Sequence, residues 1–114
     1  MPPAAFISFL QNHDQIGNRP FGERLAVLAP AAAIDAALQI MLLAPMPPML
    51  FMGEEWGSTQ AFPFFCDFGG ELAEAVRRGR KAEFAAAYSG LCERALPDPV
   101  AERTFRSAML DWSD

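Results

Sequence analysis

The chain has 114 residues, enough for one domain, and its 52% hydrophobic and 20% charged residues exclude an intrinsically disordered protein. Nine basic against fourteen acidic residues give a net charge of −5, which argues against a nucleic-acid partner because phosphate binding depends on Lys and Arg. Cys66 and Cys92 form no CxxC pair and His13 is the single histidine, so we expect no metal site, no cofactor and no disulfide framework.

Neither a secretory leader nor a membrane span is expected from the sequence. The segment Met1–Ala5 lacks the basic stretch and the apolar core that a signal peptide needs. The longest apolar stretch, Leu25–Met52, contains Asp35 and Gln39 and is interrupted by prolines, so it does not read as a membrane helix. We therefore expect no membrane partner and a reduced, cytoplasmic setting.

An apolar run at Phe6–Leu10 stops abruptly at the polar segment Gln11–Asp14. A run without alternation is typical of a strand that is covered on both faces in a parallel sheet. Because the carboxyl ends of such strands carry the functional residues of α/β proteins, the turn Asn12-His13-Asp14 is a candidate site. The residues Gln15–Gly22, with two glycines and a proline, are predicted to form a loop.

The hydrophobic period changes from about Glu23, where apolar residues recur at steps of three and four. This pattern predicts a helix with one broad apolar face. Pro30 fits the first turn of the main helix, where its missing N–H is harmless, so Glu23–Ala29 is predicted as a separate short turn. The helix must end near Leu43–Ala44, because Pro45 and the prolines after it cannot continue it.

A second apolar run, Met49–Met52, ends in Gly53 followed by Glu54, Glu55 and Trp56. Strand, loop, helix and strand in this order predict a βαβ unit with two parallel strands. The acidic residues that follow the two runs would then lie on the same edge of the sheet, where a ligand would bind.

The remaining chain is predicted to contain an aromatic loop and two helices. The loop covers residues 62–68, and Glu71–Tyr88 reads as a helix that is broken or weakened at Gly79. One more helical turn is predicted at Ala101–Ala108. The first of these helices carries four basic residues, which are expected to form a solvated face: Arg77, Arg78, Arg80 and Lys81.

Several chemistries are open to the turn Asn12-His13-Asp14. Taken alone it can be a polar cap, and a carboxylate beside a histidine can also bind sugar hydroxyls, orient a base or ligate a metal. A metal site would need more ligands than one histidine, and a Ser-His-Asp triad would need a Gly-x-Ser-x-Gly elbow, which the sequence lacks. A carbohydrate site uses the whole set, since Trp56 and the Phe-rich loop can stack on sugar rings. Ordinary packing still explains each aromatic residue taken singly.

Two of these segments resemble the α-amylase superfamily of retaining glycoside hydrolases. Phe9–Asp14 is similar to the motif of the seventh strand in that superfamily, and Leu50–Glu55 is similar to its eighth-strand segment. The resemblance covers nearly the whole chain from Phe6 onward. The segments that narrow it to the trehalohydrolase family are Gln11–Arg19, Gly22–Leu25, Phe51–Trp56, Leu72–Arg77, Gly79–Arg80, Glu83–Phe84 and Leu110–Trp112.

The resemblance implies a fold class and a reaction. The fold would be α/β, with residues 1–114 as a fragment of a catalytic (β/α)8 TIM barrel, namely its last two βα units, because a whole barrel needs ~250 residues. The implied parent reaction is hydrolysis of the α-1,4-glucosidic bond next to the terminal trehalose unit of a maltooligosyl trehalose, which releases trehalose. The partner would be maltooligosyl trehalose or a related α-glucan.

The resemblance also implies roles for individual residues. Asp14 matches the carboxylate that stabilises the transition state by binding hydroxyls of the distorted sugar, and His13 matches the neighbouring hydroxyl-binding histidine. Asn12 also supports the turn. The complete set of candidate substrate-binding residues is His13, Asn12, Arg19, Glu54, Glu55 and Trp56.

No segment of the sequence resembles the two strands that carry the nucleophile and the acid/base in the family, so the isolated chain is expected to be inactive. A fragment of a glucan branching enzyme is the alternative enzyme, because that enzyme shares the Asn-His-Asp and Phe-Met-Gly segments. A non-catalytic module that binds sugar or a partner is the other alternative. In that case the open edges of a partial sheet would favour self-association.

Overall fold

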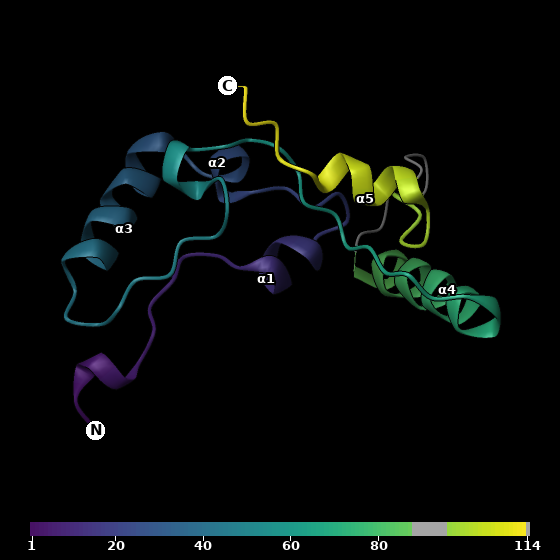
Figure 1. Cartoon of the computed structure of the whole chain (residues 1–114), viewed down its shortest axis with the longest axis horizontal. Helices are drawn as coiled ribbons and strands as arrows, with labels where there is room; N and C mark the ends of the chain where they lie inside the picture. Colours follow the sequence, from purple (N-terminus) through teal and green to yellow (C-terminus); the bar gives the residue numbers. More distant parts are fainter. Residues whose placement is uncertain (88–95, 114) are drawn as a thin grey trace.

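The computed structural model describes residues 1–87 and 96–113, which form helices of 3 to 18 residues joined by extended segments (Figure 1). Figure 1 shows α3 and α4 at opposite ends of the molecule, with α1 between them and α5 at the same end as α4. The helices in chain order are η1 (Pro3–Ala5), α1 (His13–Gly17), α2 (Leu25–Leu28), α3 (Ala31–Leu43), η2 (Glu54–Trp56), α4 (Gly70–Ala87) and α5 (Glu102–Ala108).

Proline sets the limits of α3, as the sequence predicts. Pro30 is the residue before the first helical turn, and it separates the short helix α2 from α3. The last residue of the helix is Leu43 and its C-cap is Ala44, and Pro45 comes directly after the C-cap. The helix α2 packs against α3. The prediction of a short turn followed by a main helix is therefore confirmed.

The predicted α/β fold is wrong, because the residues that the structure describes form no sheet and are mostly helical. The two apolar runs do lie side by side, joined by a single parallel bridge between Ser8 and Pro48. In this bridge the Ser8 N–H donates to the Pro47 carbonyl at 3.1 Å, and the Met49 N–H donates to the Ser8 carbonyl at 2.8 Å.

The composition of the second run explains why this bridge does not extend into a ladder. Pro47 and Pro48 have no N–H to donate, and an isolated pair of strands is marginal without further strands or a covered face. The described residues are therefore not arranged as a segment of an α/β barrel, and they contain no sheet edge through which copies could pair.

Three helices differ in detail from the predictions. The helix α4 passes through Gly79 without a break, and α5 begins at Glu102, one residue after the predicted start. The helix α1 includes the first residues of the segment 15–22, which the sequence predicts to be a loop. Tyr88, at the predicted end of the long helix, and Cys92 lie outside the described residues.

A buried polar network connects the first apolar run, the start of α2 and η2. Gln11 is 4% exposed, and its Nε2 donates to Oε1 of Glu54 at 3.2 Å. The Oε1 of Gln11 accepts the N–H of Leu25 at 3.1 Å, and Oε2 of Glu54 accepts the N–H of Phe51 at 2.9 Å. One amide and one carboxylate thus fasten three segments together.

Arg24 extends this network and is 1% exposed. Its Nε donates to the Gln60 carbonyl at 2.5 Å, its Nη1 donates to the Met52 carbonyl at 2.8 Å, and its guanidinium lies 5.1 Å from the Phe51 ring centroid. Burial lowers the pKa of Arg24, while the negative charges of Glu54 and Glu55 act in the opposite direction. The buried cation is therefore held by carbonyl dipoles, an aromatic face and nearby carboxylates.

We expect Gly22→Ala to destabilise the chain much more than Gly57→Ala. Both glycines have positive φ, +69° and +73°, so both substitutions carry a backbone strain of about 1–2 kcal/mol. A Cβ on Gly22 would lie 2.3 Å from the backbone of Phe62 and Pro63, whereas nothing lies within 4 Å of a Cβ on Gly57. The overlap should add about 1–3 kcal/mol. Urea denaturation, monitored by circular dichroism, measures the stability of the two variants. Equal denaturation midpoints would contradict the packing described for Gly22.

Glu54→Ala should also destabilise the chain, with Glu55→Ala as its matched control. Removing the Glu54 carboxylate leaves the amide of Gln11 and the N–H of Phe51 without an acceptor beside a buried arginine, at a cost of about 1–3 kcal/mol. Glu55 is exposed, so its truncation should change the free energy of unfolding by no more than about 0.5 kcal/mol. The same denaturation experiment applies, and a tolerated Glu54→Ala would show that the network contributes little.

Candidate functional site

The candidate turn forms the start of α1, and its backbone is fixed by a reciprocal capping box. The side-chain oxygen of Asn12 accepts the N–H groups of Asp14 at 2.8 Å and of Gln15 at 3.4 Å. In return, Oε1 of Gln15 accepts the N–H of Asn12 at 2.8 Å. The polar segment that follows the first apolar run is therefore a defined helix start, and Asn12 is one of its structural supports.

His13 and Asp14 point into solvent from this helix start. Their side chains are 70% and 68% exposed, and Nε2 of His13 lies 3.3 Å from Oδ1 of Asp14. An exposed carboxylate that accepts hydrogen bonds and an imidazole that can donate one suit the hydroxyl groups of a sugar. The structure thus brings these two predicted residues together in an accessible position.

The other end of α1 is held by Arg80, which comes from α4. Its Nη2 donates to the Gly17 carbonyl at 2.6 Å, and its Nη1 lies 3.4 Å from Oδ1 of Asn18. The guanidinium carbon lies 4.8 Å from the ring centroid of Phe64 and 4.6 Å from that of Phe84. A cation at this position also interacts favourably with the carboxyl end of the helix.

Burial distinguishes Arg80 from the solvated face that the sequence predicted. Its side chain is 16% exposed, and desolvation lowers its pKa, against the opposing influence of Glu83. Arg80 is therefore a packed structural residue, and the expectation that the whole basic patch is solvated is wrong for this position.

The other candidate residues occupy two kinds of environment. Glu54 is 9% exposed and engaged with Gln11 and Phe51, and Nη1 of Arg19 donates to the Glu23 carbonyl. Glu55 is exposed on η2. The bond between Gln11 and Glu54 links η2 to the residue that directly precedes Asn12, so the two candidate segments are joined through the buried network.

Trp56 presents part of an aromatic surface. It is 39% exposed, and its ring centroid lies 4.9 Å from that of Trp112, which is 73% exposed. Within the aromatic loop, Phe65 lies edge-on to both Phe62 and Phe105 of α5, whereas Phe68 is 44% exposed. The two tryptophans and Phe68 are thus aromatic groups that a ligand can reach.

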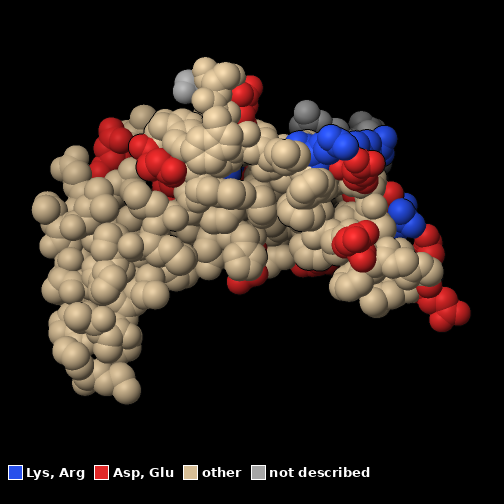
Figure 2. Space-filling model, in the orientation of Figure 1, with Lys and Arg blue, Asp and Glu red and all other residues tan. Residues whose placement is uncertain are grey.

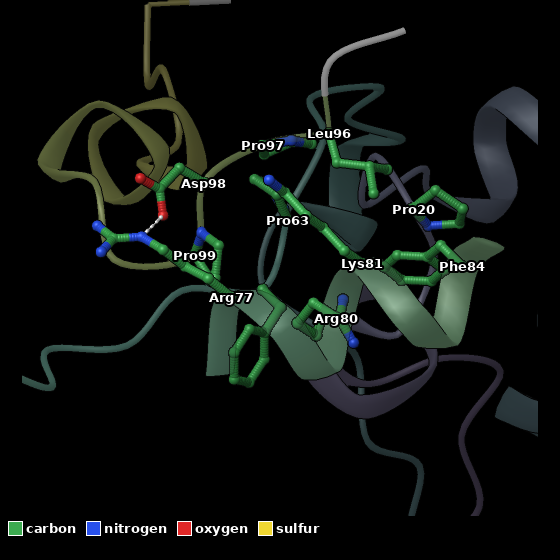
Figure 3. A pocket seen from close by; sticks show the side chains of 11 residues that line it. Pro20, Pro63, Arg77, Arg80, Lys81, Phe84, Leu96, Pro97, Asp98 and Pro99 are labelled. Atoms are coloured by element: carbon green, nitrogen blue, oxygen red, sulfur yellow. Dashed lines mark hydrogen bonds and ion pairs between the residues drawn. The ribbon is translucent and has the colours of Figure 1, made fainter. Parts of the chain in front are cut away.

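A cavity of about 260 Å³ lies between α4 and residues 96–99, and Arg80 is one of the residues that line it (Figure 3). Figure 3 shows Arg77 paired with Asp98 at its wall, where Nε of Arg77 donates to Oδ1 of Asp98 at 2.9 Å. This bond holds the pKa of Asp98 below its ordinary value. Neither His13 nor Asp14 lines this cavity, so it is separate from the candidate turn.

Sequence reasoning missed three residues that hold the site: Gln11, Arg24 and Arg80. Gln11 carries a weak signal, because it is the first polar residue after an apolar run. Arg80 and Phe84 stand four residues apart on one helix face, a spacing that allows side-chain contact. Nothing in the local sequence shows that Arg24 is buried.

A metal-ligand cluster and a membrane-spanning helix are both absent from the described parts of the chain. Residues 1–87 and 96–113 contain no group of three or more His, Cys, Asp or Glu that could hold a metal ion. None of the helices described there has the length and apolar character to cross a membrane.

Comparisons with known proteins find relatives along nearly the whole length of the chain. No protein-family model matches the chain. Malto-oligosyltrehalose trehalohydrolases match it along nearly its whole length: the enzyme of Deinococcus radiodurans is 46% identical over 109 residues, and that of Arthrobacter ramosus is 43% identical over 115 residues. These matches cover 96% and 100% of this chain but only 18% and 20% of the two enzymes.

A solved structure shows a similar backbone within a longer chain. The crystal structure of a protein from Salmonella typhimurium, assigned as an alpha amylase, superposes with a TM-score of 0.86 and 50% identity. The match covers 97% of this chain and 18% of that chain. On the strength of these similarities, this chain is homologous to malto-oligosyltrehalose trehalohydrolase and spans about a fifth of that enzyme's length.

Proposed function

We propose that the chain supplies part of the sugar-binding site of a malto-oligosyltrehalose trehalohydrolase, with Asp14 and His13 contacting the sugar at the bond that is cleaved. The reaction is hydrolysis of the α-1,4-glucosidic bond next to the trehalose unit of maltooligosyl trehalose. The observation that carries the proposal is the exposed pair of His13 and Asp14 on a capped helix start, in a chain homologous to that enzyme.

The chemistry of the pair suits a supporting role in glycoside hydrolysis. The transition state resembles an oxocarbenium ion, and hydrogen bonds to hydroxyls of the distorted sugar ring strengthen as it forms, which can supply several kcal/mol. The Asp14 carboxylate accepts such bonds, and a ring N–H of His13 donates one. Asp14 therefore stabilises the reacting sugar and does not attack it.

The nucleophile and the acid/base of the reaction lie outside these residues in this proposal. A retaining glycosidase needs two carboxyl groups about 5 Å apart across the scissile bond. Glu54 does not replace either of them, since its two carboxylate oxygens accept hydrogen bonds from Gln11 and Phe51 in the interior. Residues 1–114 alone are accordingly proposed to be inactive.

The remaining candidate residues divide by exposure. Glu55 and Trp56 are accessible on η2 and can add a hydrogen bond and a stacking surface for a sugar ring. Asn12, Arg19 and Glu54 act through the backbone and side-chain bonds that they make inside the chain. Substrate contact is thus concentrated at the start of α1 and on η2.

The test is a chimeric enzyme in which residues 1–114 replace the homologous segment of the Deinococcus radiodurans trehalohydrolase. We expect Asp14→Asn to lower kcat/KM for maltooligosyl trehalose by about 100-fold or more, which corresponds to about 3 kcal/mol of lost transition-state stabilisation. Glu102→Gln is the control, because Glu102 is exposed on α5 and pairs with Arg106 of the same helix. Its activity should stay within about twofold of the parent chimera.

Three results would contradict the proposal. An Asp14→Asn chimera with the activity of its parent would remove the role assigned to Asp14. Enzyme-like release of trehalose by purified residues 1–114 would show that the reacting carboxylates are present in this chain. New α-1,6 branches in place of free trehalose would identify the branching reaction instead.

A further inference from the structure

Charged side chains are distributed very unevenly over the molecule. Residues 1–10 and 40–52 contain no Asp, Glu, Lys or Arg, and α3 contains a single charged residue, Asp35. Figure 2 shows the result: the part of the surface that holds α3 and the amino-terminal segment is almost free of charge, apart from acidic side chains along its upper margin. Residues 1–10 and 31–52 together are called the apolar lobe below.

Large apolar side chains of this lobe are exposed to solvent. Leu43 is 85% exposed, Ile40 73%, Ile7 65%, Phe6 54% and Leu42 52%. On α3 only Met41 is buried, although the helix is apolar nearly all round. A helix with this composition is ordinarily buried inside a larger protein. Contiguous apolar surface of this kind marks an interaction site.

The shape of the chain shows that its own residues do not cover the lobe. The radius of gyration is 16.4 Å, whereas a compact domain of this length has a radius of gyration of about 13 Å. Among the described residues, the buried apolar side chains are few: Ile16, Met41, Ala73, Phe84 and Ala108. Only Met41 of these belongs to the lobe.

The structure of the Salmonella typhimurium protein indicates what covers the apolar lobe. A similar backbone, with a TM-score of 0.86 and 50% identity, occurs in the Salmonella typhimurium protein as 18% of a longer polypeptide. The arrangement with α3 at one end of the molecule therefore occurs in a protein that has further polypeptide to pack against it. The trehalohydrolases also have further polypeptide that could pack against the lobe, since this chain spans only 18–20% of their length.

We infer that the apolar lobe is a binding surface for the part of a trehalohydrolase polypeptide that this chain does not span. The partner surface is uncharged and apolar, and it covers Ile7, Ile40, Leu42 and Leu43. This inference concerns assembly and goes beyond the proposed contacts of Asp14 with sugar. It requires that the chain associate with the remaining part of the enzyme even when the two are separate polypeptides.

The experiment co-expresses residues 1–114 with a Deinococcus radiodurans trehalohydrolase that lacks the homologous segment. Affinity purification and light scattering should give a 1:1 complex. Leu42→Asp should reduce its yield by about tenfold or more, because a charge would be buried at the interface without a partner. Leu72→Asp is the matched control: Leu72 lies on α4, outside the lobe, and is 53% exposed against 52% for Leu42. It should leave the yield unchanged.

A second measurement covers the case in which the shortened enzyme does not fold. In the single-chain chimera, Leu42→Asp should lower Tm markedly and Leu72→Asp should not. The inference is overturned if the two variants behave alike in both assays. It is also overturned if residues 1–114 form a homodimer that Leu42→Asp dissociates, since a second copy would then be the occupant. A 1:1 complex that assembles but releases no trehalose would support the inference and count against the proposed function.

Discussion

The structure depends on a buried hydrogen-bond network rather than on a large apolar core. Gln11, Arg24 and Glu54 come from three separate segments, and their side chains meet in the interior with backbone groups of Leu25, Phe51, Met52 and Gln60. In an environment of low dielectric these bonds are strong, and each unpaired group would be costly. One such group exists, since Nη2 of Arg24 has no hydrogen-bond partner among the described residues. The network is thus nearly but not fully satisfied.

The network also determines how the candidate site is held. Gln11 directly precedes Asn12, so the bond to Glu54 fixes the chain just before the capping box begins. At the opposite end of α1, Arg80 fixes Gly17. A helix of five residues is too short to be stable by itself, so its direction is set by these contacts. His13 and Asp14 are therefore exposed to solvent and yet held in a defined position, which suits the contact with a sugar ring that we propose for them.

Features that depend on neighbouring residues could be predicted from the sequence, whereas features that depend on residues distant in sequence could not. Proline acts through its own ring and its missing N–H, and so the limits of α3 were predictable from Pro30 and Pro45. The side-by-side course of the two apolar runs was also predictable. The predicted sheet is absent from the described residues, because a strand requires neighbouring strands that these residues do not provide. The candidate site shows the same division. A local motif predicts His13 and Asp14 as candidate residues, but the burial of Arg24 and Arg80 depends on residues far away in sequence, and no local pattern reveals it.

The position of Arg80 between two phenylalanine rings restricts which residue can serve there. A guanidinium is flat, so it can lie against both Phe64 and Phe84 while its edge donates to the Gly17 carbonyl. Lysine would keep the positive charge, but its ammonium group is compact and strongly hydrated, and it cannot stack and donate in this forked manner. The geometry of a proposed sugar contact is therefore tied to the identity of a residue that touches no sugar. Replacing one cation by the other at position 80, although conservative in charge, would not be conservative in shape.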